Sequence, residues 1–332
     1  MLRKILIASS LLLAACSGQE VLNTFTPDHG YDVASNLIYD PAHNLRLDIY
    51  TPIGAAGAPV VVFFLGGRWS EGDKAEYKFV GQAMASRGFV CVIPNYREYP
   101  QARYPEFVQD GANAIRWTRQ HIGLYGGDLE KLILMGHSSG AHIAAMLALD
   151  EEFLKAVGGS RAWLRGMIGL AGPYDFLPLT DPDLRDIFGP PESFEKGQPI
   201  FYVDGQNPPL QLIHGEDDES VRVKNTINLA DAVRHAGGAV ETVIYPKLSH
   251  RFAVATLAAP LRGQSDVLDN VTDFIKRVAV ARNLSPDVQG VETQALPAPA
   301  PLQPPSQSLP PPPMAPDSPV APPDQPAPTP LH

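Results

Sequence analysis

The chain has 332 residues, with 36 acidic and 26 basic side chains and a formal net charge of −10 at neutral pH. This acidic balance leaves no basic surface for nucleic acid and no attraction to anionic lipid headgroups. The chain has two cysteines and neither a C-x-x-C nor an H-E-x-x-H pattern, so we expect no disulfide framework and no metal site.

A short basic segment and an apolar stretch open the chain and predict a secretory signal. The apolar stretch, residues 5–15, is too short to cross a bilayer as a helix. It ends in Leu13-Ala14-Ala15-Cys16, which resembles the bacterial lipobox, where cleavage precedes a lipid-bearing cysteine. We therefore expect residues 1–15 to be a signal peptide and residues 16–22 a tether, with Cys16 as the lipidation site. The alternative is an ordinary signal peptide with a chance cysteine.

Two or more acyl chains on Cys16 would anchor the protein stably, since each buried methylene contributes about 0.8 kcal/mol. Ser17, in place of an aspartate, resembles Gram-negative lipoproteins of the outer membrane. The expected localisation is therefore the bacterial cell envelope, on the outer membrane.

Between residues 23 and 283, apolar runs alternate with amphipathic stretches, and we predict one domain there. Strands that alternate with helices predict an α/β fold with a mostly parallel central sheet and helices on both faces. Residues 45–50 alternate with period two, as in a half-buried strand, whereas residues 60–65 are continuously apolar, as in a central strand. Further strands are expected at 89–94, 131–135, 164–171, 209–214 and 240–245, and helices at 74–87, 107–121, 223–236 and 267–281. Cys91 is expected to be a buried structural thiol.

Ser138 is the predicted nucleophile. It stands at the centre of Gly136-His137-Ser138-Ser139-Gly140, between an apolar strand and an apolar helix, which is the context of a nucleophile elbow. A serine that projects above a sheet takes a strained backbone conformation, and glycines two residues to either side let the strand and the helix pass closely. Alone the pattern is weak, because it arises by chance about 0.1 times per sequence of this kind.

Partners for Ser138 are expected after two later strands, because functional groups gather at the carboxyl ends of parallel strands. One strand is followed by Glu216, Asp217 and Asp218, and the next by His250. Serine, then acid, then histidine is the chain order of α/β-hydrolases. In that chemistry the histidine takes the proton of the serine and returns it to the leaving group, while a buried carboxylate orients the histidine.

These features together resemble the α/β-hydrolase superfamily, and within it the esterase and lipase branch that includes hormone-sensitive-lipase-like carboxylesterases and kynurenine-formamidase-like enzymes. The resemblance rests on ordered stretches: Phe64-Leu65-Gly66-Gly67-Arg68-Trp69, Pro94-Asn95-Tyr96-Arg97, the elbow, Gly172-Pro173-Tyr174-Asp175, 214–218 and 245–250. It selects Asp218, four residues after His214, over Asp217 and Glu216, with Asp175 as a third choice. It also implies a cap over the active site at about 172–207.

The oxyanion hole is expected from Ser139 and the Gly66-Gly67 pair. Preorganised N–H donors must meet the negative charge on the carbonyl oxygen, and the resemblance places them at Ser139 and in the loop that follows residues 60–65, with Arg68 as a further donor. The alternative for this loop is a simple Gly-Gly turn. Many relatives have a loop-ordering histidine where this chain has Leu65, so the loop needs other support. The resemblance also implies that Trp69 covers the substrate pocket, the alternative being a core aromatic.

Other histidines are expected to have structural roles. His137 flanks the serine and is expected to point away from the site, His142 to pack or cap, and His214 to hold its own loop.

The end of the chain changes composition. Of the 34 prolines, 16 fall between Pro297 and Pro330, and such a segment cannot bury enough apolar surface to fold. We predict a disordered tail at 284–332, which is either a solvated end or a docking segment for a protein partner.

The sequence therefore predicts a lipid-anchored serine hydrolase that cleaves a small carboxylic ester without a cofactor, using Ser138, His250 and Asp218. Two alternatives stay open. An amide, formamide or thioester hydrolase would use the same tetrahedral intermediate. A non-catalytic envelope scaffold would bind partners through the proline-rich tail.

Overall fold

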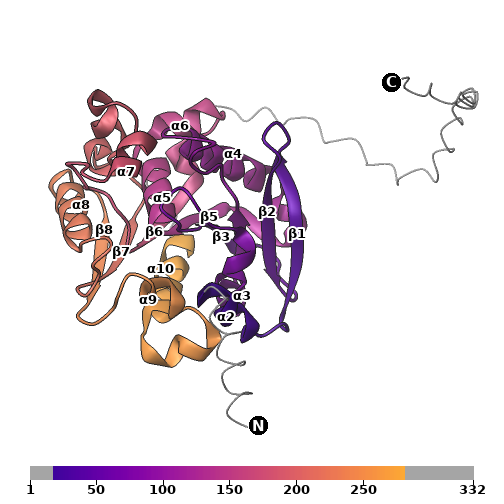
Figure 1. The fold of residues 1–332 in the computed structure, drawn as a ribbon. Helices are drawn as coiled ribbons and strands as arrows, with labels where there is room; N and C mark the ends of the chain where they lie inside the picture. Colours follow the sequence, from indigo (N-terminus) through magenta and orange to yellow (C-terminus); the bar gives the residue numbers. More distant parts are fainter. Residues whose placement is uncertain (1–17, 281–332) are drawn as a thin grey trace, which may run out of the picture. The chain divides into compact units, whose positions relative to one another are not determined.

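The computed structural model describes residues 18–280, which are coloured in Figure 1. The predicted signal peptide, the lipidation site Cys16 and the predicted tail at 284–332 lie outside these residues and stay predictions. Within the described part of the chain, no helix is both long and apolar enough to cross a membrane.

The described residues form one eight-stranded sheet with the order β1-β2-β4-β3-β5-β6-β7-β8. The pairs β1–β2 and β2–β4 are antiparallel, and the other neighbours are parallel. This confirms the predicted mostly parallel α/β sheet. The strands are β1 (Tyr31–Asp40), β2 (Leu45–Pro52), β3 (Ala58–Phe64), β4 (Val90–Pro94), β5 (Gly127–His137), β6 (Leu164–Leu170), β7 (Leu210–Gly215) and β8 (Val240–Tyr245).

Helices cover both faces of the sheet, as predicted. Figure 1 shows α3 (Lys78–Ala85) and α10 (Val267–Val280) on one side and α4 (Glu106–His121) and α5 (Ser139–Leu149) on the other. The central strands β3 and β4 are apolar and buried, as expected for strands covered on both faces. Cys91 on β4 is fully buried and free, which confirms a structural thiol. The remaining α-helices are α2 (Gly18–Thr24), α6 (Glu151–Ala156), α7 (Pro182–Ile187), α8 (Lys224–His235) and α9 (Phe252–Ala255).

Three local features differ from the predictions. The strand β1 was not predicted, because its exposed positions and two register shifts leave no clean alternation. The predicted helix 74–87 is divided into a 3₁₀ turn, η1 (Lys74–Tyr77), and α3, and Asp73 caps the turn by accepting from the N–H of Ala75. The helix α2 overlaps the segment predicted as a tether, residues 16–22, and extends beyond it to Thr24. Near its end, Asn23 donates to the carbonyl of Ala75 and accepts from the N–H of Phe79.

The segment predicted as a cap, residues 172–207, contains α7 and two 3₁₀ turns, η4 (Pro191–Gly197) and η5 (Pro199–Tyr202). The side chain of Gln198, which is fully buried, accepts from the N–H of Phe176 and donates to the carbonyl of Phe194. The segment also bonds the body of the domain, since the Asp181 carboxylate pairs with Arg68 at 2.8 Å. These bonds hold the conformation of a segment whose sequence shows no helical or strand periodicity.

Candidate active site

Ser138 lies at the turn between β5 and α5, with φ 55° and ψ −123°. This is a left-handed conformation that non-glycine residues rarely adopt. Its N–H donates to the carbonyl of Leu170 on the neighbouring strand β6 at 2.9 Å, which helps to hold the turn. The strained turn predicted for the nucleophile is therefore present.

The two flanking glycines are required by close backbone contact. A Cβ atom on Gly136 would collide with the carbonyl of Gly140, and a Cβ on Gly140 would collide with the carbonyl oxygen of Phe64 at the end of β3. Strand, turn and helix therefore touch through their main chains, as the elbow pattern predicts.

The structure brings Ser138, His250 and Asp218 into one hydrogen-bonded chain. His250 Nε2 lies 2.9 Å from Ser138 Oγ, and His250 Nδ1 lies 2.8 Å from Asp218 Oδ2. The other carboxylate oxygen of Asp218 accepts the N–H groups of Ser220 and Val221 at 2.9 and 2.8 Å. Burial by itself would raise the pKa of Asp218, but bonds from His214 and His250 and from the Val221 N–H hold it well below its usual range. Asp218 is thus an ionised partner for His250.

The alternative acids do not reach His250. Glu216 and Asp217 are exposed on the same loop. The carboxylate of Asp175 instead accepts the side-chain amide of Asn228 at 2.6 Å. The geometry agrees with the choice of Asp218.

Two further histidines support the site. His214 Nε2 lies 2.7 Å from the carbonyl of Val221 and 3.2 Å from Asp218 Oδ2, so it holds its own loop, as expected. His137 differs from the expectation that it points away: its Nε2 donates to the carbonyl of His250 at 3.0 Å. Burial lowers the pKa of His137 to about 3, so the ring is neutral and positions the main chain of His250.

The loop after β3 lies directly against the nucleophile. A Cβ on Gly66 would come within 3.2 Å of the Ser138 Cβ and 2.8 Å of His137 Nδ1. Gly67 has φ +142°, and a Cβ there would collide with the carbonyl of Glu71. Ser139 is the first residue of α5, where helices leave N–H groups without partners inside the helix. These three residues therefore present backbone to the space beside Ser138.

Two tyrosines support this loop in place of a histidine. The hydroxyl of Tyr96 donates to the carbonyl of Leu65 at 3.2 Å, and that of Tyr77 donates to the carbonyl of Gly66 at 3.3 Å. Both side chains are buried, and burial raises the pKa of Tyr77 to about 12. Tyr96 stands in one of the stretches that carry the family resemblance, but its sequence context indicates no role for it, and no local pattern indicates Tyr77.

A cleft of about 920 Å³ opens over Ser138 and His250. Trp69 reaches its wall but is only 4% exposed, because it packs against Phe107, Phe176 and Phe188. Trp69 is therefore both a wall residue and a core aromatic. Phe176, Leu177 and Leu184 from the cap segment add an apolar side to the same cleft.

His142 belongs to the aromatic cluster around Trp69 and not to the catalytic group. Its ring meets Trp69 edge-on at 5.1 Å, and its Nε2 donates to the carbonyl of Gly197 in the cap at 2.8 Å. Burial lowers the pKa of His142 to about 4, so the side chain is neutral. The expected packing role is confirmed, with a bond to the cap in addition.

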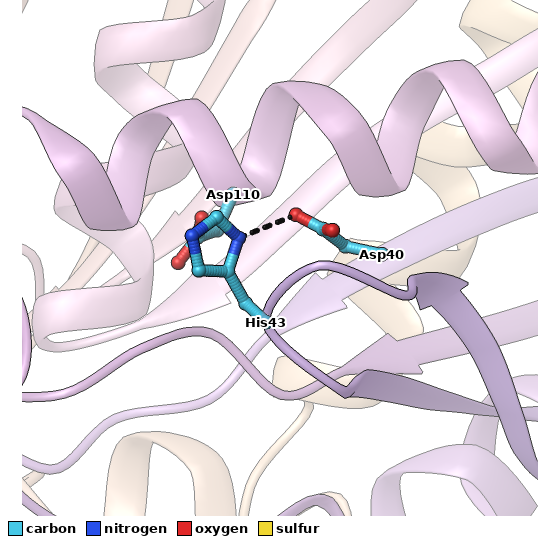
Figure 2. A group of neighbouring side chains, drawn as sticks. All are labelled: Asp40, His43 and Asp110. Carbon is cyan, nitrogen blue, oxygen red and sulfur yellow. Dashed lines mark hydrogen bonds and ion pairs between the residues drawn. The ribbon is translucent and has the colours of Figure 1, made fainter.

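Among residues 18–280, a group with metal-ligand geometry is formed by Asp40, His43 and Asp110 (Figure 2). His43 Nδ1 lies 2.9 Å from Asp40. Asp110 is fully buried and already binds the guanidinium of Arg97 through both oxygens, at 2.8 and 2.9 Å. A carboxylate engaged in this way is a poor metal ligand, and the group fits an ion-pair network better than a metal centre.

Comparisons with known proteins find similar sequences among esterases. The chain is 32% identical over 266 residues to isoprenylcysteine alpha-carbonyl methylesterase ICME of Arabidopsis thaliana, covering 73% of this chain and 62% of that protein. It is 31% identical to esterase LipQ of Mycobacterium tuberculosis, covering 73% and 61%. The chain thus spans less than two thirds of the length of these relatives.

Among solved structures, the propionate-bound esterase 2 of Thermogutta terrifontis superposes with a TM-score of 0.63 at 24% identity, covering 76% of this chain and 96% of that one. A truncated carbohydrate esterase from gut microbiota superposes with a TM-score of 0.64 at 20% identity, covering 77% and 99%. These likenesses show the α/β-hydrolase fold. Because the BD-FAE family model matches residues 47–233, more than half of the chain, the chain belongs to the BD-FAE family.

Proposed function

We propose that the protein is a serine carboxylesterase that hydrolyses a small carboxylic ester through an acyl-enzyme intermediate. The observation that carries the proposal is the continuous hydrogen-bonded chain from Ser138 Oγ through His250 to the buried Asp218. Two relatives with at least 31% identity are an esterase and a methylesterase by name, which supports the same reaction class.

In the proposed reaction His250 Nε2 accepts the proton of Ser138 while Oγ attacks the ester carbonyl. The oxyanion that forms is met by the N–H groups of Gly67 and Ser139, and each such donor is typically worth about 10²–10³ in rate. His250 then donates its proton to the leaving alcohol, and the acyl group stays on Ser138. Water then attacks the acyl-enzyme, with His250 again as the base. The bond between the acyl group and Ser138 Oγ breaks, His250 returns the proton to Oγ, and the carboxylic acid leaves. Asp218 keeps the His250 ring oriented and stabilises its cation.

A fluorophosphonate probe tests the proposal directly, because it modifies only an activated serine. We expect stoichiometric labelling, with the modified peptide containing Ser138, and loss of labelling in His250→Ala. His235→Ala is the matched control, since His235 is exposed on α8 and bonds only the carbonyl of Asp231 within the described residues. It should label like the wild type.

Failure of the folded wild-type protein to label would contradict the proposal and favour the non-catalytic scaffold. If the protein is labelled but turns over amides, formamides or thioesters and no esters, Ser138 is still the nucleophile, but the substrate is not an ester. A screen of acetyl esters against the matching amides and thioesters separates these outcomes.

We also propose that Cys16 carries lipid and anchors the protein to the bacterial cell envelope, at the outer membrane. The support is the Leu13-Ala14-Ala15-Cys16 pattern after a short apolar stretch. Cys16→Ala should move the protein from the membrane fraction to the soluble fraction of cells. Continued sedimentation of this variant with membranes would overturn the proposal.

A further inference from the structure

Three basic side chains that line the cleft have no ionic partner within the described part of the chain. Arg222, Lys224 and Arg251 are exposed, and among residues 18–280 none of their side chains makes an ion pair or hydrogen bond. Arg68 lines the same cleft but is neutralised by Asp181 at 2.8 Å. Carboxylates outnumber basic groups by ten in this chain. The exposed acids nearest in sequence, residues 216, 217 and 219, do not line the cleft.

The sheet order places these cations on one side of Ser138. Arg222 and Lys224 follow β7 and the loop of Asp218, and Arg251 follows β8 and His250. Strands β7 and β8 lie on one side of β5, whereas β3, with the Gly66-Gly67 loop, lies on the other. Glu71 and Glu76, which also line the cleft, come from the chain after β3. The cleft therefore has a positive side at His250 and a negative side at the oxyanion loop.

The geometry of the reaction determines which part of the substrate lies against the positive side of the cleft. In the tetrahedral intermediate the oxyanion faces the Gly66-Gly67 loop, and the oxygen of the leaving group must face His250 Nε2 to receive its proton. The leaving alcohol therefore extends towards the side with Arg222, Lys224 and Arg251. The apolar side formed by Phe176, Leu177 and Leu184 remains for the acyl group.

We propose that Arg222, Lys224 and Arg251 bind an anionic group, a carboxylate or a phosphate, on the leaving-alcohol part of the substrate. This inference rests on the proposed esterase function and names its substrate class. Guanidinium groups bind carboxylate and phosphate through paired N–H donors, and lysine adds a point charge. Because the three side chains are exposed, each contributes only a small factor, and together they should favour an anionic leaving group about tenfold.

The test compares two acetyl esters that differ in one charge: 4-acetoxybenzoate, with an anionic leaving group, and 4-acetoxybenzamide, with a neutral one. The measured quantity is the ratio of their kcat/KM values, so that a general loss of activity cancels. We expect the ratio to fall about tenfold in the triple variant Arg222→Gln, Lys224→Gln, Arg251→Gln. Higher salt should lower the wild-type ratio as well, because exposed charges are screened.

The matched control is Arg116→Gln, Arg185→Gln, Lys276→Gln, which removes three exposed cations that do not line the cleft and form no ion pair among the described residues. Its ratio should stay at the wild-type value. A third ester, 4-acetoxyphenyl phosphate, separates the two anions, since a larger fall for this ester would identify phosphate as the preferred group.

An unchanged ratio in the cleft variant, or an equal fall in the control variant, would overturn the inference. So would a fall confined to esters with the charge on the acyl side, measured with 4-nitrophenyl hemisuccinate against 4-nitrophenyl valerate. If the wild type hydrolyses the neutral ester, the proposed function stands whatever the ratio does. If it hydrolyses no ester, the proposed function fails and this inference fails with it.

Discussion

Around Ser138 three elements meet through their main chains, whereas the cap segment reaches the cleft through side chains. On the elbow side, Gly136 and Gly140 allow β5, α5 and the end of β3 to touch. On the cap side, Phe176 and Phe188 pack on Trp69 and His142 in an aromatic cluster. The glycines that allow the elbow contacts stand within one five-residue motif. The cap contacts instead join distant segments, and Phe176 and Phe188 are more than 100 positions from Trp69.

The two sides of the cleft should therefore tolerate amino-acid substitutions differently. Main-chain contact tolerates no added atom, because the backbone cannot give way without moving a whole strand. A side-chain cluster can repack with hydrophobic groups of similar volume. We therefore expect chemistry to depend most sharply on the elbow side, and substrate choice to vary with the cap side.

The largest expected effect is that of Ser138→Ala. Loss of the nucleophile should lower ester turnover by at least about 10⁴-fold, as in other triads, while the fold is kept. The checks are kcat on a soluble acetyl ester and the urea unfolding midpoint. Ser35→Ala, an exposed position on β1, is the control and should turn over like the wild type. Near-normal turnover in Ser138→Ala would place the nucleophile elsewhere.

Gly140→Ala should destabilise the fold by about 1–3 kcal/mol, which is typical of overpacking. The added methyl group would collide with the carbonyl of Phe64, at the strand end that carries the Gly66-Gly67 loop, so activity should fall with stability. Urea unfolding and kcat are measured together. Gly123→Ala, where a Cβ meets no atom within 4 Å, is the matched control. Equal stabilities of the two variants would contradict the close contact.

Tyr96→Phe and Tyr77→Phe should each cost about 1 kcal/mol of stability, because a buried carbonyl loses its donor. These hydroxyls hold the oxyanion loop, so their loss should affect the chemical step more than substrate binding. In the double variant we expect kcat to fall about tenfold and KM to rise by less. Tyr202→Phe, which removes a hydroxyl that donates to the carbonyl of Lys196, is the comparison within the cap segment. If kcat falls in Tyr202→Phe and not in the Tyr77 and Tyr96 variants, the chemistry depends on the cap segment and not on the support of the oxyanion loop, which contradicts the prediction.

The smallest effect is expected at Glu98, a partly buried residue near the oxyanion loop. Burial, then the charges of Asp73, Glu71 and Glu76, raise the pKa of Glu98 to about 7. The folded state therefore retains a proton that the unfolded chain loses near pH 4.5, so the free energy of unfolding falls as pH rises towards 7 and levels off above it.

Glu98→Gln should remove this fall and stabilise the protein at pH 8 relative to the wild type, with little difference at pH 5. The gain should stay below about 1 kcal/mol, because solvent screens a partly exposed group. Urea unfolding at the two pH values checks the prediction, with the exposed Glu192→Gln as the control. An equal gain at both pH values would show that charge is not the cause.

Much of the fold and of the site could be predicted from sequence because its signals are local. Continuous apolar runs such as residues 60–65 predict central strands, and Gly136, Ser138 and Gly140 form a pattern only five residues long. Asp218 and His250 could be expected near Ser138 because parallel strands bring their carboxyl ends to one edge. Each of these predictions needs only a hydrophobic pattern, a short motif or a rule of sheet topology.

Only the tertiary structure decided how the site is supported. The bonds of Tyr77 and Tyr96 to the oxyanion loop, and of His137 to the carbonyl of His250, depend on side-chain directions that no local pattern encodes. The same holds for the three cations of the cleft that have no ion-pair partner among residues 18–280, because this depends on where every carboxylate of the folded domain lies. The sequence alone determines which chemistry the elbow can perform. Packing between distant segments decides which groups surround the elbow. Contacts between distant segments leave no periodic pattern in the sequence, so they could not be predicted from it.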